Sequence, residues 1–307
     1  MPSSPVAEAS TVSPTSAGEA HAAALGRRGA VAFVTPAFIL IGVFLAFPAL
    51  WTLYLGLTNY RLTGAAAARP ELVGLDNYAT ALTDPAFFNA LWVTILFVLG
   101  SAILGQAVLG FALAWMLRTW RSPIRRALET LVIVAWIIPG SVVAFLWIAF
   151  LDGDSGTLNV LLGGLDLEWL LRYPLLSIIV FNIWRGTAFS MLLFGAALSS
   201  LPPSHLETAR LAGAATWQQL RDIILPSIKG HILTNLLLIS LWTFNDFTPF
   251  LITGGGPAGA TELLPVFIFR EALSSFQLGY GAAISTIMLI INLVIALFYI
   301  RLLRSRA

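Results

Sequence analysis

Six long runs of apolar residues constrain the fold of this chain more than any other feature. A helix needs about 20 consecutive apolar residues to cross a bilayer, and each run is long enough. The runs are continuous rather than alternating, which favours helices over the strands of a membrane barrel. We therefore predict an all-α, polytopic membrane protein with about six transmembrane helices. The runs are residues 31–55, 88–116, 127–150, 175–198, 232–252 and 281–303.

The composition agrees with burial in lipid and excludes several kinds of chemistry. Only 10% of the 307 residues are charged and 58% are hydrophobic, whereas a soluble domain is about one quarter charged. The chain has no cysteine, which excludes disulfides, thiolate metal sites and cysteine nucleophiles. Its three histidines are scattered, so we expect no metal site. No nucleophile, base and orienting group occur as a set, so we expect no catalytic centre.

The basic residues predict the orientation of the chain. Most of the 17 lie in alternate connections between the apolar runs: Arg27, Arg28, Arg118, Arg121, Arg125, Arg126, Arg210, Arg221, Lys229, Arg301, Arg304 and Arg306. Because connections rich in Lys and Arg stay in the cytoplasm, both termini should be cytoplasmic. Residues 1–26 are rich in Ala, Ser, Thr and Pro without periodicity. They are interpreted as a disordered cytoplasmic tail rather than a signal peptide.

One polar segment interrupts the apolar runs on the predicted cytoplasmic side. Its sequence is LETARLAGAATWQQLRDIILP, residues 206–226. Ser204 and Glu207 have the spacing of a capping box, and Gly213 suits a left-handed helix end. A second capping box, Thr216 with Gln219, should begin another helix that ends where the proline interrupts it. We predict two short helices joined at a bend.

The same segment resembles the EAA motif of binding-protein-dependent ABC importer permeases. The matching residues, at the family spacing, are Glu207, Ala209, Gly213, Ile223, Leu225 and Pro226. Thr208 replaces the usual Ala, and Ala212 replaces an Asp that is common in sugar permeases. The resemblance extends over about residues 31–304, through FNIWRGTAFSMLL, FNDFTPFLITGGGP and GYGAAIS. The chain is thus identified as similar to carbohydrate permeases of the MalF type.

The resemblance implies a type I ABC importer permease fold over residues 27–307, behind the tail. It implies that residues 201–226 form a coupling loop that docks on a cytoplasmic ATPase and transmits its motion to the spans. The implied partners are a second homologous permease, two ATPase subunits that bind ATP and Mg, and an extracytoplasmic solute-binding protein. The expected location is the plasma (inner) membrane of a bacterium. The only segment like a phosphate-binding loop, residues 254–261, lacks the required Lys, so this chain should not hydrolyse ATP.

Two charged residues within the apolar runs, Arg185 and Asp246, are candidates for a functional site. They could pair with each other, or they could face a cavity and bind a polar solute. The resemblance places seven residues on substrate-lining helices: Asn182, Arg185, Gly186, Phe189, Trp242, Asn245 and Asp246. The expected solute is a sugar or sugar-like molecule, and disaccharides, amino sugars, polyols and glycerophosphate derivatives all fit.

Two other classes of function fit the sequence less well than the importer permease. An ion-driven secondary transporter would use the same two charged residues, but it usually has more spans and inverted repeats. A membrane-embedded enzyme would need a cluster of polar catalytic groups at one depth, and the sequence offers too few. The importer permease remains the prediction.

Overall fold

The computed structural model describes residues 27–118 and 123–304, and every regular element in this part of the chain is a helix, apart from one isolated bridge between Thr58 and Leu72. The predicted tail, residues 1–26, lies outside the described residues. The chain divides into a unit that ends at Tyr54 and a unit that begins at Leu55. The prediction of an all-α protein is confirmed.

The described part of the first unit is a single long helical segment. It consists of α2 (Arg27–Ile41), the π-helical turn η1 (Gly42–Ala46) and α3 (Phe47–Gly56), whose last residues belong to the second unit. The stretch Val31–Gly56 is long and apolar enough to cross a membrane, as the first apolar run predicts.

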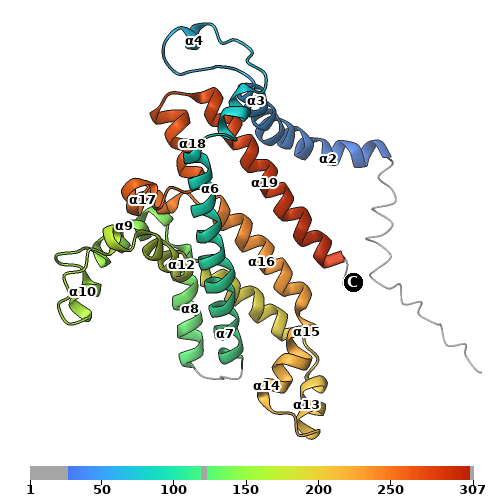
Figure 1. The fold of residues 1–307 in the computed structure, drawn as a ribbon. Helices are drawn as coiled ribbons and strands as arrows, with labels where there is room; N and C mark the ends of the chain where they lie inside the picture. The colour runs from blue at the N-terminus through green and yellow to red at the C-terminus, as the bar shows by residue number, and fades with distance from the viewer. Residues whose placement is uncertain (1–26, 119–122, 305–307) are drawn as a thin grey trace, which may run out of the picture. The chain divides into compact units, whose positions relative to one another are not determined.

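Three more predicted runs form long helices in the second unit (Figure 1). The second run is continuous through α6 (Pro85–Phe97), η2 (Val98–Gln106) and α7 (Ala107–Leu117), over 33 residues. The fourth run is α12 (Pro174–Ser199), and the sixth is α19 (Leu278–Arg304). The α12 helix packs against α7 and η2, and α19 packs against α16 (Lys229–Phe244).

The third run is bent rather than straight. It divides into α8 (Pro123–Ile137) and α9 (Gly140–Phe150), which meet at 103°. Pro139 causes the break, because proline has no N–H to donate and disfavours helical geometry in the residue before it. A hydropathy window does not detect this bend, since the residues on both sides are apolar.

The predicted fifth run, residues 232–252, is wrong as a single span. The α16 helix ends at Phe244, and α17 (Thr248–Thr253) begins after a short non-helical break. Two features explain the break. The Asp246 carboxylate accepts a hydrogen bond from the Thr248 N–H at 2.9 Å, and Pro249 follows with no N–H of its own. The α17 helix ends at Gly254, which is left-handed with φ +61°, as expected for the glycine-rich turn.

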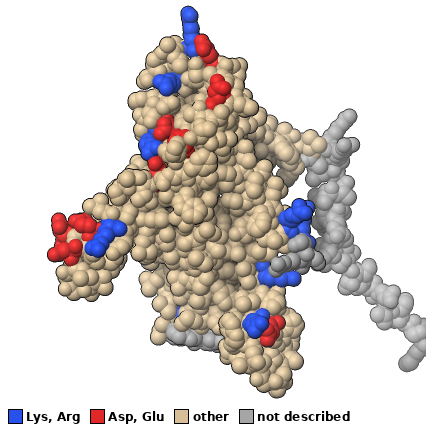
Figure 2. All heavy atoms as spheres, viewed as in Figure 1, with Lys and Arg blue, Asp and Glu red and all other residues tan. Residues whose placement is uncertain are grey.

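Short helices occupy the connections, where charged side chains gather. Figure 2 shows Lys, Arg, Asp and Glu mainly on these connections and at span ends, with almost none along the spans on the visible face. The short elements of the second unit outside the polar segment are α4 (Ala65–Ala68), α5 (Asp76–Ala81), α10 (Thr157–Leu161), α11 (Trp169–Arg172), η4 (Pro257–Gly259), α18 (Leu264–Phe269) and η5 (Arg270–Ser274).

A buried carboxylate holds the connection before α18. Glu262 is 7% exposed and forms an ion pair with Arg270, which also pairs with Glu271 at 3.3 Å. Burial raises the pKa of Glu262 above its ordinary value, although the positive charge of Arg270 opposes this shift. The ion pairs of Arg270 with Glu262 and Glu271 fix the connection before α18 in place.

Candidate functional site

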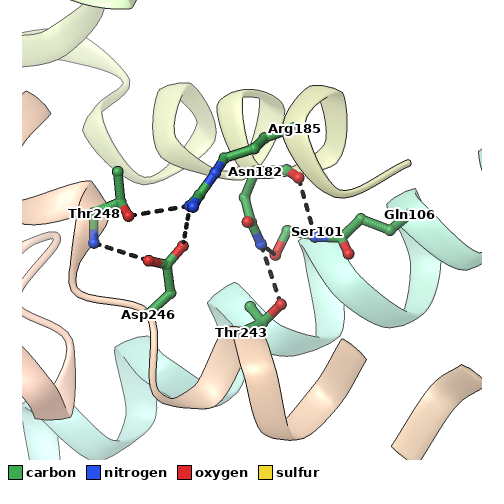
Figure 3. Close-up of polar contacts among 7 residues, drawn as sticks. All are labelled: Ser101, Gln106, Asn182, Arg185, Thr243, Asp246 and Thr248. Carbon is green, nitrogen blue, oxygen red and sulfur yellow. Dashed lines mark hydrogen bonds and ion pairs between the residues drawn. The ribbon is translucent and has the colours of Figure 1, made fainter. Parts of the chain in front are cut away.

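Arg185, halfway along α12, points to the break between α16 and α17 (Figure 3). Its Nη1 donates to Asp246 Oδ2 at 3.2 Å and to Thr248 Oγ1 at 3.0 Å, both at the break between α16 and α17. The same guanidinium approaches Gly140, the first residue of α9, so closely that an added Cβ there would lie 3.0 Å from Nη2. One side chain therefore links α12 to both breaks.

The Arg185–Asp246 pair is largely removed from water. The Arg185 side chain is 20% exposed and that of Asp246 is 8% exposed. A charge so placed is costly unless a partner of opposite sign compensates it. The two side chains also border the same pocket. The two residues therefore pair with each other and also border a cavity, whereas their binding of a polar solute stays a prediction.

Beside the ion pair, a set of uncharged polar side chains connects three helices. The Asn182 side-chain amide donates to Ser101 Oγ on η2 at 2.7 Å and to Thr243 Oγ1 on α16 at 3.4 Å. Gln106 Nε2 in turn donates to the Asn182 carbonyl oxygen at 3.0 Å. Ser101, Gln106 and Asn182 are all buried. The donors of Asn182 are thus engaged in helix–helix contacts, which fix the wall of the pocket.

Six of the seven residues predicted to bind substrate line one pocket. The lining comprises Gln106, Trp136, Asn182, Arg185, Gly186, Phe189, Ile239, Trp242, Thr243 and Asp246. Asn245 is not among them. Its amide bonds the Leu241 carbonyl at 2.6 Å and Asn292 Oδ1 on α19 at 3.0 Å. The volume that the centre of a water molecule can reach is about 30 Å³, so the pocket holds no more than a few waters.

Three aromatic rings form one side of the pocket. The ring centroids of Trp136, Phe189 and Trp242 lie 5.9 Å, 5.9 Å and 6.1 Å apart, and Trp242 is half exposed. Aromatic faces beside a few fixed polar groups suit a ligand with one apolar and one hydroxylated side.

Sequence reasoning missed four residues of this pocket: Gln106, Trp136, Ile239 and Thr243. Trp136 lies near the end of α8, three residues before the break at Pro139, and that break was not predicted. Gln106 gave a usable signal, since it is an amide deep inside a 33-residue apolar span whose other amide, Asn89, lies near the start of the span, and polar groups are rare in such spans.

Gly186 is required by the packing of Gln106. A Cβ at position 186 would lie 2.2 Å from the Gln106 side chain, whereas a Cβ at Gly195 on the same helix would meet nothing within 4 Å. We predict that Gly186→Ala lowers the free energy of unfolding by about 1–3 kcal/mol through overpacking. Gly195→Ala, the matched control, should leave it unchanged or raise it slightly. Thermal unfolding of the purified protein in detergent measures both, and equal midpoints for the two variants would contradict the prediction.

The polar segment, residues 201–226, forms two short helices joined at a bend, as predicted. The first is α13 (Pro203–Leu211), which closes with a Schellman motif. The Ala214 N–H bonds the Ala209 carbonyl at 2.9 Å, and the Gly213 N–H bonds the Arg210 carbonyl at 3.0 Å. Gly213 is left-handed, with φ +79°, and this confirms its predicted role.

The predicted helix starts in this segment are wrong in detail. The N-cap of α13 is Pro202 and forms no side-chain cap, so Ser204 and Glu207 form no capping box. Proline supplies a φ suited to the helix start, which makes the serine cap unnecessary.

The second helix begins one residue earlier than its predicted cap implies. It runs through α14 (Thr216–Gln219), η3 (Leu220–Ile224) and α15 (Leu225–Ser227). The N-cap is Ala215, whose N–H donates to Gln218 Oε1 at 2.8 Å. Gln219 instead donates to the Ala214 carbonyl at 2.8 Å and fixes the corner.

Pro226 does not end this helix. The break is at Ile228, where the helix meets α16 at 70°. A π-turn precedes the proline: the Leu225 N–H bonds the Leu220 carbonyl, five residues back. The chain thus continues in helical geometry through a residue that has no N–H.

The motif residues divide into an inner and an outer set. Ala209 is 7% exposed, and Ile223 and Leu225 are partly buried. Neighbouring Ile224 is fully buried and packs with Ala197 of α12. Glu207, Gly213 and Pro226 are exposed.

Two large apolar side chains on the segment are also exposed, and sequence reasoning did not include them. Leu211 is 90% exposed and Trp217 is 65% exposed. The available signal was two large apolar residues within an otherwise polar stretch. Large exposed apolar side chains grouped on one surface commonly mark a protein interface.

Comparison with known proteins shows the family of this chain. Residues 106–306 match the model of a family described as binding-protein-dependent transport system inner membrane component. A probable ABC transporter permease of Pyrococcus horikoshii is 30% identical over 282 residues, which cover 88% of this chain and 94% of that protein. The sulfoquinovosyl glycerol transport system permease protein of Agrobacterium fabrum is 27% identical over 90% of this chain and 91% of its own length.

A solved structure shares the fold. It is a bacterial ABC transporter involved in the import of the acidic polysaccharide alginate, and one of its chains superposes with a TM-score of 0.72. The alignment covers 89% of this chain and 94% of that chain, at 23% identity.

Proposed function

This chain belongs to the binding-protein-dependent transport system inner membrane components, and from that premise we propose that it passes an uncharged sugar or polyol across a bacterial plasma membrane. It is a permease subunit of an ABC importer with a type I importer fold. Such subunits are transport proteins rather than enzymes. In the proposal, residues 27–307 form the multi-pass permease domain, with both termini in the cytoplasm.

The proposal that the solute is an uncharged sugar or polyol rests on the pocket at Arg185. Three aromatic rings face it, and its two charged residues neutralise each other. A hydroxylated ring can stack on the aromatic side and exchange hydrogen bonds with the amides and the ion pair. An anionic solute would find Arg185 already paired with Asp246. This arrangement favours a neutral solute over the anionic sugars and phosphates that the names of some relatives describe.

The small volume of the pocket supports a shared site. About 30 Å³ is too little for a sugar ring, so the remaining wall must come from outside this chain or from another conformation. We propose that a second homologous permease supplies that wall. An extracytoplasmic solute-binding protein would deliver the solute, as it does in the alginate importer with its periplasmic protein bound.

The segment 201–226 is proposed as the coupling loop. Its inner face packs on α7 and α12 through Leu206, Leu220 and Ile224, while Leu211 and Trp217 project outward. One of two ATPase subunits, which bind ATP and Mg, would hold this outer surface. Their rigid-body motion would then reach α12 and α16 directly, and the pocket would alternate between the two sides of the membrane.

Reconstitution tests the proposal. The importer assembly in proteoliposomes, supplied with its solute-binding protein and ATP, should take up a neutral sugar or polyol from a panel that also contains a sugar phosphate and a uronic acid. We expect ATP-dependent uptake of a neutral member and substrate-stimulated ATP hydrolysis. Uptake driven by an ion gradient without ATP would overturn the importer mechanism, and preferred uptake of the charged members would overturn the solute class.

A further inference from the structure

A second pocket lies at one end of the spans, apart from the site at Arg185. It is formed where α7 and α12 end, where α8 begins, and where α13 crosses them, and its volume is about 530 Å³. Its lining includes Arg118, Arg125 and Arg210, with Glu129 as the one acidic residue. Three positive charges thus face one negative charge across a cavity of this size.

The charges in this pocket are unevenly compensated. Arg125 pairs with Glu129 at 2.7 Å. Neither Arg118 nor Arg210 forms an ion pair within residues 27–118 and 123–304. Arg118 lies over the ring of Trp115, which holds its guanidinium in place. Burial and the nearby positive charge of Arg210 both lower the pKa of Arg118. The positive charges of Arg118 and Arg210 therefore repel each other in a pocket that is partly shielded from water.

The remaining lining of this pocket is apolar apart from Ser199. Leu117 and Met191 are buried beside Ala196 and Gly195 of α12. The cationic side chains therefore border an apolar cavity at a span end, which is the level of lipid headgroups in a bilayer. Basic pockets between helices at this level are suited to phosphate groups, and guanidinium groups bind phosphate oxygens in a bidentate manner.

We propose that Arg118 and Arg210 bind a phosphate group in this pocket, in the form of an anionic phospholipid headgroup or free phosphate. The bound group offsets the repulsion between the two arginines. Because Arg118 follows α7 and Arg210 lies on α13, the bound phosphate also connects the polar segment to the end of a span. The lipid composition of the membrane would then influence how firmly that segment is held. This inference does not depend on which solute the chain carries.

Lipid retention tests the phospholipid form. The importer assembly is placed in nanodiscs of phosphatidylcholine with or without phosphatidylglycerol, then released and examined by native mass spectrometry. We expect wild type to retain one phosphatidylglycerol that the double variant Arg118→Gln/Arg210→Gln loses, with affinity falling about tenfold for each arginine removed. The matched control is Arg126→Gln, which removes an exposed charge from the same end of α8 without lining the pocket, and it should retain the lipid.

Free phosphate is tested in phosphatidylcholine nanodiscs alone. A rise in the unfolding temperature with inorganic phosphate, present in wild type and absent in the double variant, would support the soluble form. The variant Arg118→Lys/Arg210→Lys keeps both charges and should recover much of the binding, which separates loss of the site from misfolding. Equal lipid retention and equal phosphate response in wild type and the double Gln variant would overturn the proposal.

Discussion

Arg185→Gln is expected to lower the free energy of unfolding by about 3 kcal/mol, because it leaves the Asp246 carboxylate buried without a cation. Removing one partner of a buried ion pair typically costs about 3–5 kcal/mol, and Asp246 is only 8% exposed. Thermal unfolding in nanodiscs measures the effect.

Asp246→Asn should lower the free energy of unfolding less than Arg185→Gln does. Asparagine retains an oxygen that can accept the Thr248 N–H, so the start of α17 is preserved. Arg185 also keeps its bond to Thr248. The double variant Arg185→Gln/Asp246→Asn should lose less stability than the two single losses added together, with a coupling of about 1–3 kcal/mol. Strictly additive losses would show that the pair contributes nothing as a unit.

Transport assays distinguish a loss of stability from a loss of solute binding when Arg185 and Asp246 are replaced. If the pair contacts the solute, the double variant should assemble and hydrolyse ATP at the basal rate, yet lose most substrate-stimulated hydrolysis and uptake. An Asp246→Asn variant with unchanged uptake and unchanged stimulated hydrolysis would count against a role in solute binding. Assembly is checked first by co-purification of the partner subunits.

Loss of ATPase binding is expected when both outward apolar residues of the polar segment are truncated. Leu211 and Trp217 are 90% and 65% exposed, so replacing them with Ala should hardly change the stability of this chain. At an interface, truncation of a central aromatic residue commonly costs 2 kcal/mol or more. We therefore expect at least about a thirtyfold weaker association of the double variant with the ATPase subunits, measured by co-purification and titration.

The chain supplies a matched control for this test. Leu161 on α10 is 72% exposed and lies far in sequence from the polar segment. Leu161→Ala should leave ATPase association unchanged. If the Leu211→Ala/Trp217→Ala variant also kept its ATPase subunits and its ATP-dependent uptake, the segment would not be the docking surface.

Sequence reasoning succeeded where a property is local. The length of a continuous apolar run can be read directly from the sequence, and four of the six predicted runs form single spans. Gly213 was correctly assigned because a left-handed helix end strongly favours glycine. The breaks were not predicted, because Pro139 and the segment around Asp246 interrupt helices without changing the mean hydropathy of the run.

The pocket could be predicted only in part, because it is formed by contacts between residues that are distant in the sequence. Arg185 and Asp246 are separated by 61 positions, and the sequence left open whether they pair. Asn245 was placed with its neighbours in the predicted site, but the backbone turns at the break and directs it to Asn292 on α19. Trp136 became visible as a pocket residue only with the bend of α8. Such placements follow from tertiary packing, which a single sequence does not state.

The Schellman closure of α13 has a consequence for how such transporters diversify. The corner is completed by its own backbone hydrogen bonds and by Gln219, so its shape does not depend on Leu211 or Trp217. If the segment docks on the ATPase as proposed, substitutions at those outward positions would alter the choice of ATPase while the permease stays folded. Under the proposed function, recognition of the ATPase and recognition of the solute would be encoded in separate residues, and each would be free to evolve on its own.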